Sequence, residues 1–237
     1  MTGPRWSATR LVQAAGLGAW AATFWILLLM GRVGLYLSPR IAWVVPVGAI
    51  GLTFAAVVRL ATARSRASEP ATLATVGGTL VMIAPVILLL SLPPTTLDSF
   101  AANRRASVTR VGWIGNAQFS ASGGLTMLDL ASAQTTPEGQ RALIDRAGDT
   151  VTLEGFLGQD DTPVADQFYL DRFFISCCVA DALLVRIRVV NWTGAGSLSR
   201  DSWYRVTGAV YPVGREVLVV PTQVRSIPQP ADPYLSP

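Results

Sequence analysis

Residues 150–157 read TVTLEGFL, and this stretch decides the fold class of the second half of the chain. Its apolar side chains alternate with Thr152 and Glu154, which is the period of two expected of a half-buried β-strand. The same alternation returns further along the chain, and the turn-like segments NWTGAGS and PVGR interrupt it. The other segments with this pattern are LVRIRVV (184–190), WYRVTGAV (203–210) and EVLVV (216–220).

A further strand is predicted in QFYLDRFFISC (167–177), so that the count of short strands reaches about five. Five short strands favour a small closed β-barrel of the OB-like type, and a small β-sandwich is the alternative. Gly155 and Gly208 lie inside two of these strands, where glycine often marks a bulge or a sharp bend. Residues 97–237 are therefore expected to form an all-β or α+β domain built on an OB-like barrel.

A helix is predicted just before the first of these strands. Thr136 is a suitable N-cap, Pro137 suits the first helical position, and Glu138 places an acid in the first turn. The helix is expected to continue through GQRALIDRA to Gly148.

The first hundred residues contain three long uncharged windows: Leu11–Gly31, Ile41–Val58 and Pro70–Leu97. Each window is long enough to cross a hydrocarbon core, which takes roughly 20 apolar residues. The whole chain is 51% hydrophobic and 14% charged, a balance more typical of membrane proteins than of soluble ones. We predict a transmembrane anchor over residues 1–96, with helices at about 11–31, 41–59 and 72–92.

The arginines around these windows predict the orientation in the cell membrane. Five of them are expected on the side of the N-terminus: Arg5, Arg10, Arg59, Arg64 and Arg66. The loop between the first two helices holds only Arg32 and Arg40. By the positive-inside rule the N-terminus is cytoplasmic, and after three crossings residues 97–237 are extracytoplasmic.

The composition also excludes several classes of function. The chain has no histidine, so a Ser-His-Asp triad, a Cys-His pair and an HExxH zinc site are all absent. Residues 97–237 carry twelve arginines and fourteen acids, which is the wrong balance for a nucleic-acid-binding surface. We expect a protein that is not an enzyme and has no nucleic-acid partner.

Cys177 and Cys178 are the two cysteines of the chain, they are adjacent, and Asp181 follows three residues after the second. In a regular strand neighbouring side chains point to opposite faces, so two such thiolates cannot share one metal ion unless the strand ends there. A disulfide between neighbours is strained, because adjacent Cα atoms are about 3.8 Å apart. The open alternatives are metal binding through Cys177, Cys178 and Asp181, a vicinal or partner disulfide, free thiols, and plain packing with Asp181 capping a turn.

One combination of segments resembles a known bacterial family. FYLDRFFISCCVADA, followed by the strand with alternating arginines and by WYRVTGAVY, is similar to the YcgQ-like family of two-component membrane permease subunits. The segment LPPTTLDSFAANRR (92–105) is similar to that family too. The resemblance implies a helical anchor, a C-terminal domain of unknown function and a separate multi-spanning permease as partner. It also implies a link with metal ions, although many relatives carry His-rich loops that this chain lacks.

These observations together predict an accessory, membrane-anchored subunit of a permease complex. Its partners would be the lipid bilayer and the permease, and its candidate metal ligands are Cys177, Cys178 and Asp181. Such a mixed donor set suits a divalent ion such as Zn²⁺. The first alternative is a stand-alone membrane-tethered thiol redox or metal-sensing protein. A second alternative, an envelope hydrolase, would rely on Asp160, Asp161 and Asp166.

Overall fold

The computed structural model describes residues 5–65, 72–91, 97, 99–102, 104, 124–158, 166–214 and 216–236. The chain divides into two compact units, Met1–Thr95 and Thr96–Pro237. Most of the segment 92–105 lies outside the described residues, as do Arg66, Asp160 and Asp161.

The first unit contains three long helices, which are α1 (Ala8–Leu29), α2 (Val44–Ala61) and α3 (Leu73–Ser91). All three are long and apolar enough to cross a membrane, which confirms the prediction of three such helices. The 3-10 helix η1 (Val33–Leu35) lies between α1 and α2. Two short strands, β1 (Arg5–Trp6) and β2 (Arg64–Ser65), flank the α1–α2 pair and join each other.

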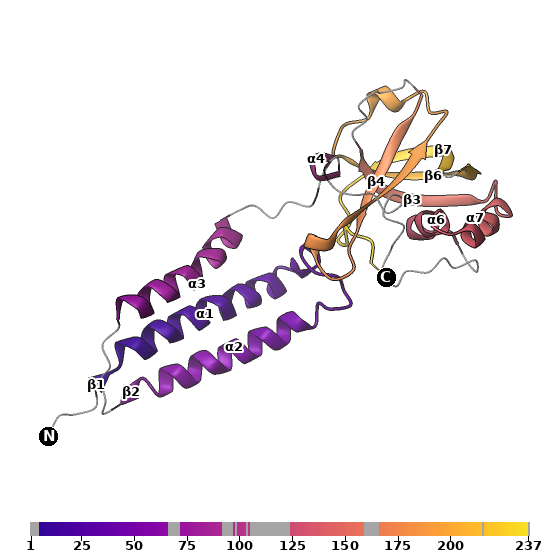
Figure 1. Cartoon of the computed structure of the whole chain (residues 1–237). Helices are drawn as coiled ribbons and strands as arrows, with labels where there is room; N and C mark the ends of the chain where they lie inside the picture. Colours follow the sequence, from indigo (N-terminus) through magenta and orange to yellow (C-terminus); the bar gives the residue numbers. More distant parts are fainter. Residues whose placement is uncertain are drawn as a thin grey trace. The chain divides into compact units, whose positions relative to one another are not determined.

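Helix α1 is the central helix of this unit, because it packs against both α2 and α3 (Figure 1). Its buried positions are small residues and one threonine: Ala14, Gly16, Ala21 and Thr23. A side chain at Gly48 of α2 would put a Cβ 2.9 Å from the ring of Phe24, so glycine permits this close approach. The Trp25 indole N–H donates to Thr53 Oγ1 of α2 (3.1 Å), and the Trp20 indole N–H donates to the Met82 carbonyl of α3 (2.9 Å).

The second unit is built around five strands. They are β3 (Thr150–Leu157), β4 (Phe168–Phe174), β5 (Leu183–Val189), β6 (Trp203–Val213) and β7 (Glu216–Ile227). They form a closed barrel in the order β3-β4-β5-β7-β6, and β6 pairs back onto β3 (Figure 1). All the pairings are antiparallel except β5 with β7, which is parallel at Arg188↔Leu218 and Val189↔Val219. This five-stranded Greek-key arrangement is an OB-like barrel, as predicted.

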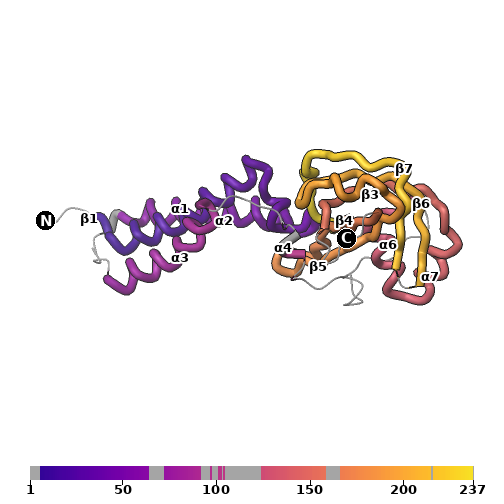
Figure 2. The backbone as a smooth tube through the Cα atoms, turned by 90° about the horizontal axis from the view of Figure 1, so that it is seen from above, coloured from indigo at the N-terminus to yellow at the C-terminus, as the bar shows by residue number. Residues whose placement is uncertain are grey.

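The longest pairing in the barrel is the β6–β7 hairpin, whose strands run side by side (Figure 2). Its register shifts between Thr207 and Gly208, so Gly208 lies at a bulge, as its place in the sequence indicated. A Cβ at Gly208 would lie 2.3 Å from the Val220 carbonyl oxygen. At Gly155 of β3 a Cβ would lie 2.6 Å from the Asp171 carbonyl oxygen. Both positions therefore need glycine, because a neighbouring backbone comes too close for any side chain.

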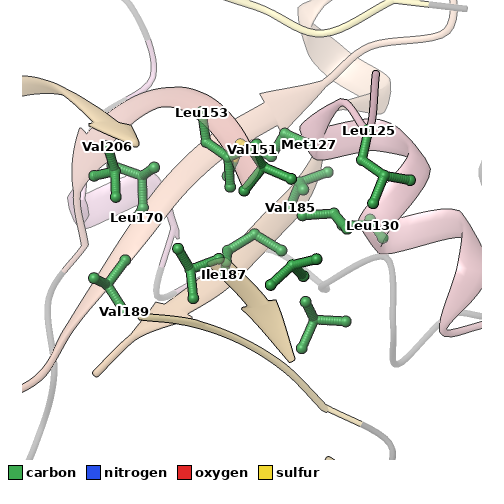
Figure 3. Packing of buried hydrophobic residues seen from close by; sticks show 14 of the residues in the cluster. Leu125, Met127, Leu130, Val151, Leu153, Leu170, Val185, Ile187, Val189 and Val206 are labelled. Atoms are coloured by element: carbon green, nitrogen blue, oxygen red, sulfur yellow. The ribbon is translucent and has the colours of Figure 1, made fainter. Parts of the chain in front are cut away.

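Two helices cover the barrel: α6 (Met127–Ala133) packs on β5, and α7 (Pro137–Ile144) packs on β6. Thr136 caps α7, with its hydroxyl accepting from the Gly139 N–H (3.1 Å), so the predicted start is confirmed. The helix ends at Ile144, a few residues before Gly148. Figure 3 shows the core where α6 meets the strands, with Met127 and Leu130 facing Val151 and Val185.

A second buried cluster lies apart from this core. It combines Phe156, Phe173, Ile175, Leu184 and Trp203 of the barrel with Tyr234 and with Ala102 of the short helix α4 (Ser99–Ala102). Residues 232–235 are held here by backbone hydrogen bonds: the Ile175 N–H donates to the Leu235 carbonyl (2.9 Å), and the Leu235 N–H donates to the Phe173 carbonyl (2.8 Å). The Leu97 N–H donates to the Tyr234 hydroxyl (3.3 Å). Leu97, the first described residue of this unit, is thus linked through Tyr234 to the segment that lies along the end of β4.

Candidate functional site

The cysteine pair lies in the turn between β4 and β5. Strand β4 ends at Phe174, three residues earlier than the predicted strand. Phe174 forms a parallel bridge with Leu235, the Ile175 N–H donates to the Leu235 carbonyl, and the backbone then turns. The turn continues into the 3-10 helix η2 (Val179–Asp181), and β5 begins at Leu183. Cys177 is exposed and Cys178 is half-buried, and both are free thiols. The opposite-face argument for a regular strand therefore does not apply to the pair.

Asp181 closes this turn with its side chain. Its Oδ2 accepts the Cys177 backbone N–H at 2.8 Å, and its Oδ1 accepts the Ser176 N–H at 3.2 Å. In return the Asp181 N–H donates to the Cys178 carbonyl at 3.0 Å. An aspartate commonly stabilises a turn in this way, since its short side chain reaches nearby backbone groups. The capping alternative drawn from the sequence therefore describes what Asp181 does here.

The same contacts set the ionisation of the cluster. A hydrogen bond to the Asp181 carboxylate, then one to Cys178, raises the pKa of the Cys177 thiol to about 11. Burial raises the pKa of Asp181, but hydrogen bonds from the Cys177 thiol and the surrounding backbone N–H groups outweigh it and leave that pKa below its ordinary value. At neutral pH Cys177 is a protonated donor and Asp181 is a carboxylate that accepts from it. A protonated thiol is a weak nucleophile and a weak metal ligand.

The arrangement does not fit a resident metal ion as it stands. Both carboxylate oxygens of Asp181 are occupied by backbone N–H groups, and the Cys177 thiol is held in its protonated form. In the described part of the chain, no group of three or more His, Cys, Asp or Glu residues has a spacing that could hold a metal ion. The chemistry that this turn offers by itself is that of two adjacent reduced thiols beside a carboxylate.

Arg172 of β4, five residues before Cys177, is held in place by several contacts. Its guanidinium lies over the Trp203 ring, 5.6 Å from the ring centroid, and Nε donates to the Pro233 carbonyl at 3.2 Å. Nη2 donates to the Asp232 carbonyl at 2.5 Å. Burial lowers the pKa of Arg172, and the charges of Glu154 and Asp232 oppose the shift. Arg172 thus fixes residues 232–235 along the end of β4, from which the cysteine turn emerges.

The barrel also contains a buried ion pair that the sequence analysis did not predict. Asp171 of β4 is fully buried and forms a bidentate ion pair with Arg186 of β5, with Nε–Oδ1 at 2.9 Å and Nη2–Oδ2 at 2.7 Å. Burial raises the pKa of Asp171, and the hydrogen bonds and charge of Arg186 pull in the opposite direction. The guanidinium of Arg186 also lies 4.7 Å from the centroid of the Tyr169 ring, a cation–π contact. A lone acid within FYLDRFF, facing a strand with alternating arginines, is the signal that could have predicted this pair.

These features define the class of the chain: a protein with three helices suited to a membrane and a separate OB-like domain that carries a thiol pair. Residues 141–237 match the DUF1980 C-terminal domain, and this range contains all five barrel strands and the cysteine turn. No curated protein sequence is significantly similar to the chain.

Two solved structures are similar to parts of the chain. The hypothetical protein ygiW from E. coli shares 16% sequence identity, and the match covers 48% of this chain and 99% of that one, with a TM-score of 0.27. A chain of the Stn1-ten1 complex from S. pombe shares 13% identity, and the match covers 33% of this chain and 57% of that one, with a TM-score of 0.24.

Proposed function

We propose that this protein is a membrane-anchored, non-catalytic accessory subunit of a bacterial permease complex. The observation that carries the proposal is the charge pattern of the three helices. Within them the ionisable side chains are Arg10, in the first turn of α1, and Arg59, in the last turn of α2. Transporters that move ions through their own helices keep ionisable groups at membrane depth, so a separate multi-spanning partner would supply the path.

The surface of the helices supports a partner inside the membrane. Ala22 of α1 is exposed, and a Cβ added at Gly18 would meet nothing within 4 Å. These two positions lie four residues apart, as in helix faces that allow close approach of another helix. In the proposed arrangement the N-terminus is cytoplasmic and residues 97–237 are extracytoplasmic.

The metal-handling part of the proposal concerns Cys177, Cys178 and Asp181. A divalent ion would require the Cys177 thiol to lose its proton and Asp181 to release the backbone of the turn. The partner or water would complete the coordination shell, because three ligands leave a tetrahedral zinc site one short. The site is therefore proposed as a surface that binds metal only together with the permease.

The partner is tested by purification of the tagged full-length chain from native membranes in mild detergent. A multi-spanning protein should co-purify with the wild-type chain and be reduced by Gly18→Leu, which fills the uncovered face of α1. Gly51→Leu serves as the matched control, since Gly51 of α2 is also open to a Cβ but lies on another helix. Recovery of the chain alone from every preparation would count against the proposal.

The metal is tested on the same preparation by elemental analysis. A metal that depends on the site should fall in Cys177→Ser and Cys178→Ser variants of the complex, and it should be absent from the chain purified without its partner. Equal metal content in the wild type and both variants would contradict the metal-binding part of the proposal, but it would not contradict the proposed role as a membrane-anchored subunit.

The orientation can be tested with the native thiols, because the chain has two cysteines and both lie in this turn. A membrane-impermeant maleimide should label intact cells as fully as permeabilised ones. Labelling that requires permeabilisation would place the turn on the cytoplasmic side.

A second candidate function is a stand-alone thiol redox protein, favoured by the adjacency of the two free thiols and the exposure of Cys177. In that case the isolated full-length chain should show reversible loss of both thiols under mild oxidation, without a partner. Thiol titration before and after a reductant separates this candidate from the accessory subunit.

A further inference from the structure

One end of the helical unit gathers basic residues from separate parts of the chain. Strands β1 and β2 pair antiparallel, which places Arg5 opposite Ser65 and Trp6 opposite Arg64. The Ser7 N–H then donates to the Ala63 carbonyl at 2.8 Å. The segment before α1 is thereby tied to the segment after α2, and two arginines far apart in sequence are brought to one small sheet.

Two further arginines lie at the same end. Arg10, in the first turn of α1, donates through Nη1 to the Thr62 carbonyl at 2.5 Å, just after the end of α2. Arg59, in the last turn of α2, is exposed. The carbonyl bonded by Arg10 belongs to the C-cap residue of α2, where the helix dipole favours a positive charge. Arg59 lies in the last turn of the same helix, whereas Arg5 and Arg64 lie on the β1–β2 sheet.

In the sequence around this end arginines outnumber acids. Residues 1–68 contain seven arginines and no Asp or Glu, and Glu69 is the first acid in the chain. Trp6 pairs with Arg64 in the β1–β2 sheet and has 49% of its surface exposed. Arginine and tryptophan together are typical of the level at which a helix leaves the hydrocarbon core and meets the headgroups.

We propose that the basic end, defined by Arg5, Arg10, Arg59 and Arg64 with Trp6, binds the headgroup of an anionic phospholipid. A guanidinium matches a phosphate with two parallel hydrogen bonds, and clustered arginines beside membrane helices attract anionic lipids. The indole of Trp6 suits the interface between headgroup and acyl chain. The ligand is a lipid and not free phosphate, because the helices that carry the arginines present apolar faces for its acyl chains.

The other end of the unit provides an internal comparison. The connection between α1 and α2 carries Arg32 and Arg40, which are exposed and lie apart from the β1–β2 sheet. It has half the number of arginines of the basic end, and neither Arg32 nor Arg40 lies on a strand. The proposed site therefore depends on the gathering of charge by the two short strands and not on arginine as such.

The test uses the full-length chain purified in a neutral detergent. Its thermal stability is measured by size-exclusion chromatography after heating, with added phosphatidylglycerol, phosphatidylcholine or inorganic phosphate, and lipid retention is counted by native mass spectrometry. Phosphatidylglycerol should raise the melting temperature and be retained, whereas phosphatidylcholine and phosphate should do neither. Equal effects of the two lipids would overturn the proposal, and an equal effect of phosphate alone would replace the lipid by a free anion.

The variants locate the site. Arg5→Gln with Arg64→Gln should weaken phosphatidylglycerol binding by about 25-fold, since each arginine near an anionic membrane surface contributes about fivefold. Arg32→Gln with Arg40→Gln removes the same charge at the other end and should leave the binding within about twofold of wild type. Equal losses in both pairs would show a general charge effect and overturn the site. If the first pair does not fold, the exposed Arg59→Gln replaces it, and unchanged binding in that variant contradicts the proposal.

Discussion

The Asp181 carboxylate accepts the backbone N–H of Cys177 at 2.8 Å. Asp181 and Cys177, two of the metal ligands that the sequence predicts, are therefore already hydrogen-bonded to each other. The thiol also donates to this carboxylate, which is the main cause of its raised pKa. The relationship makes Asp181 the group that controls how reactive Cys177 is.

Replacement of Asp181 by Asn should therefore activate the thiol. We expect Asp181→Asn to increase alkylation of Cys177 by iodoacetamide at pH 8 by about tenfold, because the thiolate fraction rises more than the nucleophilicity falls. The rate is measured by mass spectrometry of the peptide in a Cys178→Ser background. Asp145→Asn, an exposed acid at the end of α7, should leave the rate unchanged. An unchanged rate in Asp181→Asn would show that another group protects the thiol.

The stability of the protein at alkaline pH should also depend on the hydrogen bond from the Cys177 thiol to Asp181. The pKa of Cys177 is raised in the fold from 9.0 to about 11, so its contribution is fully present below pH 9 and is lost as the pH rises towards about 11. We expect the stability difference between wild type and Cys177→Ser to shrink between pH 9 and 11. Thermal unfolding followed at both pH values measures it. A difference that stays constant over this range would contradict the assigned hydrogen bond.

At acidic pH the protonation of Asp181 should determine the stability of the cysteine turn. Its pKa is lowered in the fold from 3.8, so its contribution is present above that value and disappears as the pH falls through the lower folded value. We expect Asp181→Asn to be less stable than wild type at pH 6 and equal to it at pH 2. Urea unfolding at the two pH values tests this, and a penalty that persists at pH 2 would point to packing instead.

The ion pair between Asp171 and Arg186 predicts a strong and asymmetric effect. Arg186→Met leaves a fully buried carboxylate without its partner and should lower the free energy of unfolding by about 3 kcal/mol at pH 7. Because burial raises the pKa of Asp171, the penalty should be smaller at pH 5, where the carboxyl group takes up a proton more readily.

The matched control for this pair is Arg188→Met on the same strand. Its carboxylate partner is Glu216, whose side chain is 60% exposed, at 3.4 Å. Such a pair contributes at most about 1 kcal/mol. Chemical denaturation of both variants gives the comparison, and equal losses would show that burial of Asp171 does not set the cost.

The bulge in the β6–β7 hairpin predicts a steric effect. Gly208→Ala would place a Cβ 2.3 Å from the Val220 carbonyl oxygen and should destabilise the domain by about 1–3 kcal/mol. Gly196→Ala, in the 3-10 helix η3 (Ala195–Ser197), meets nothing within 4 Å and should be close to neutral. The two variants are compared by melting temperature. A neutral Gly208→Ala would mean that the bulge can open at no cost.

Local patterns were enough to predict the barrel and its entry helix. Strand β3 has the predicted bounds, and the Thr136 cap starts α7, because both signals lie within a few residues of the feature that they predict. Strand β7 was predicted only to residue 220 but continues to Ile227. Pro221, which usually ends a strand, is tolerated because it lies opposite the bulge at Gly208, where the ladder is already interrupted.

Long-range relationships were not predictable in the same way. Helix α6 escaped notice although Thr126 and Asp129 form a capping box at its start. The Asp171–Arg186 pair depends on the register of β4 against β5, which the sequence does not specify residue by residue. The sequence predicts a strand through Cys177, but the Ile175 N–H bonds to Leu235, sixty residues away in the chain, and the backbone turns after it.

The hydrogen bond from the Leu97 N–H to the Tyr234 hydroxyl connects the chain before the barrel to the end of β4. Leu235, the next residue, is bonded to Phe173 and Ile175, and Ile175 stands two positions before Cys177. The bonded contacts that start at Leu97 therefore pass through Tyr234 and Leu235 to Phe173 of β4 and to Ile175. Leu97 also packs against the second buried cluster, so a displacement of the chain at Leu97 would act on the end of β4 and on the cysteine turn together.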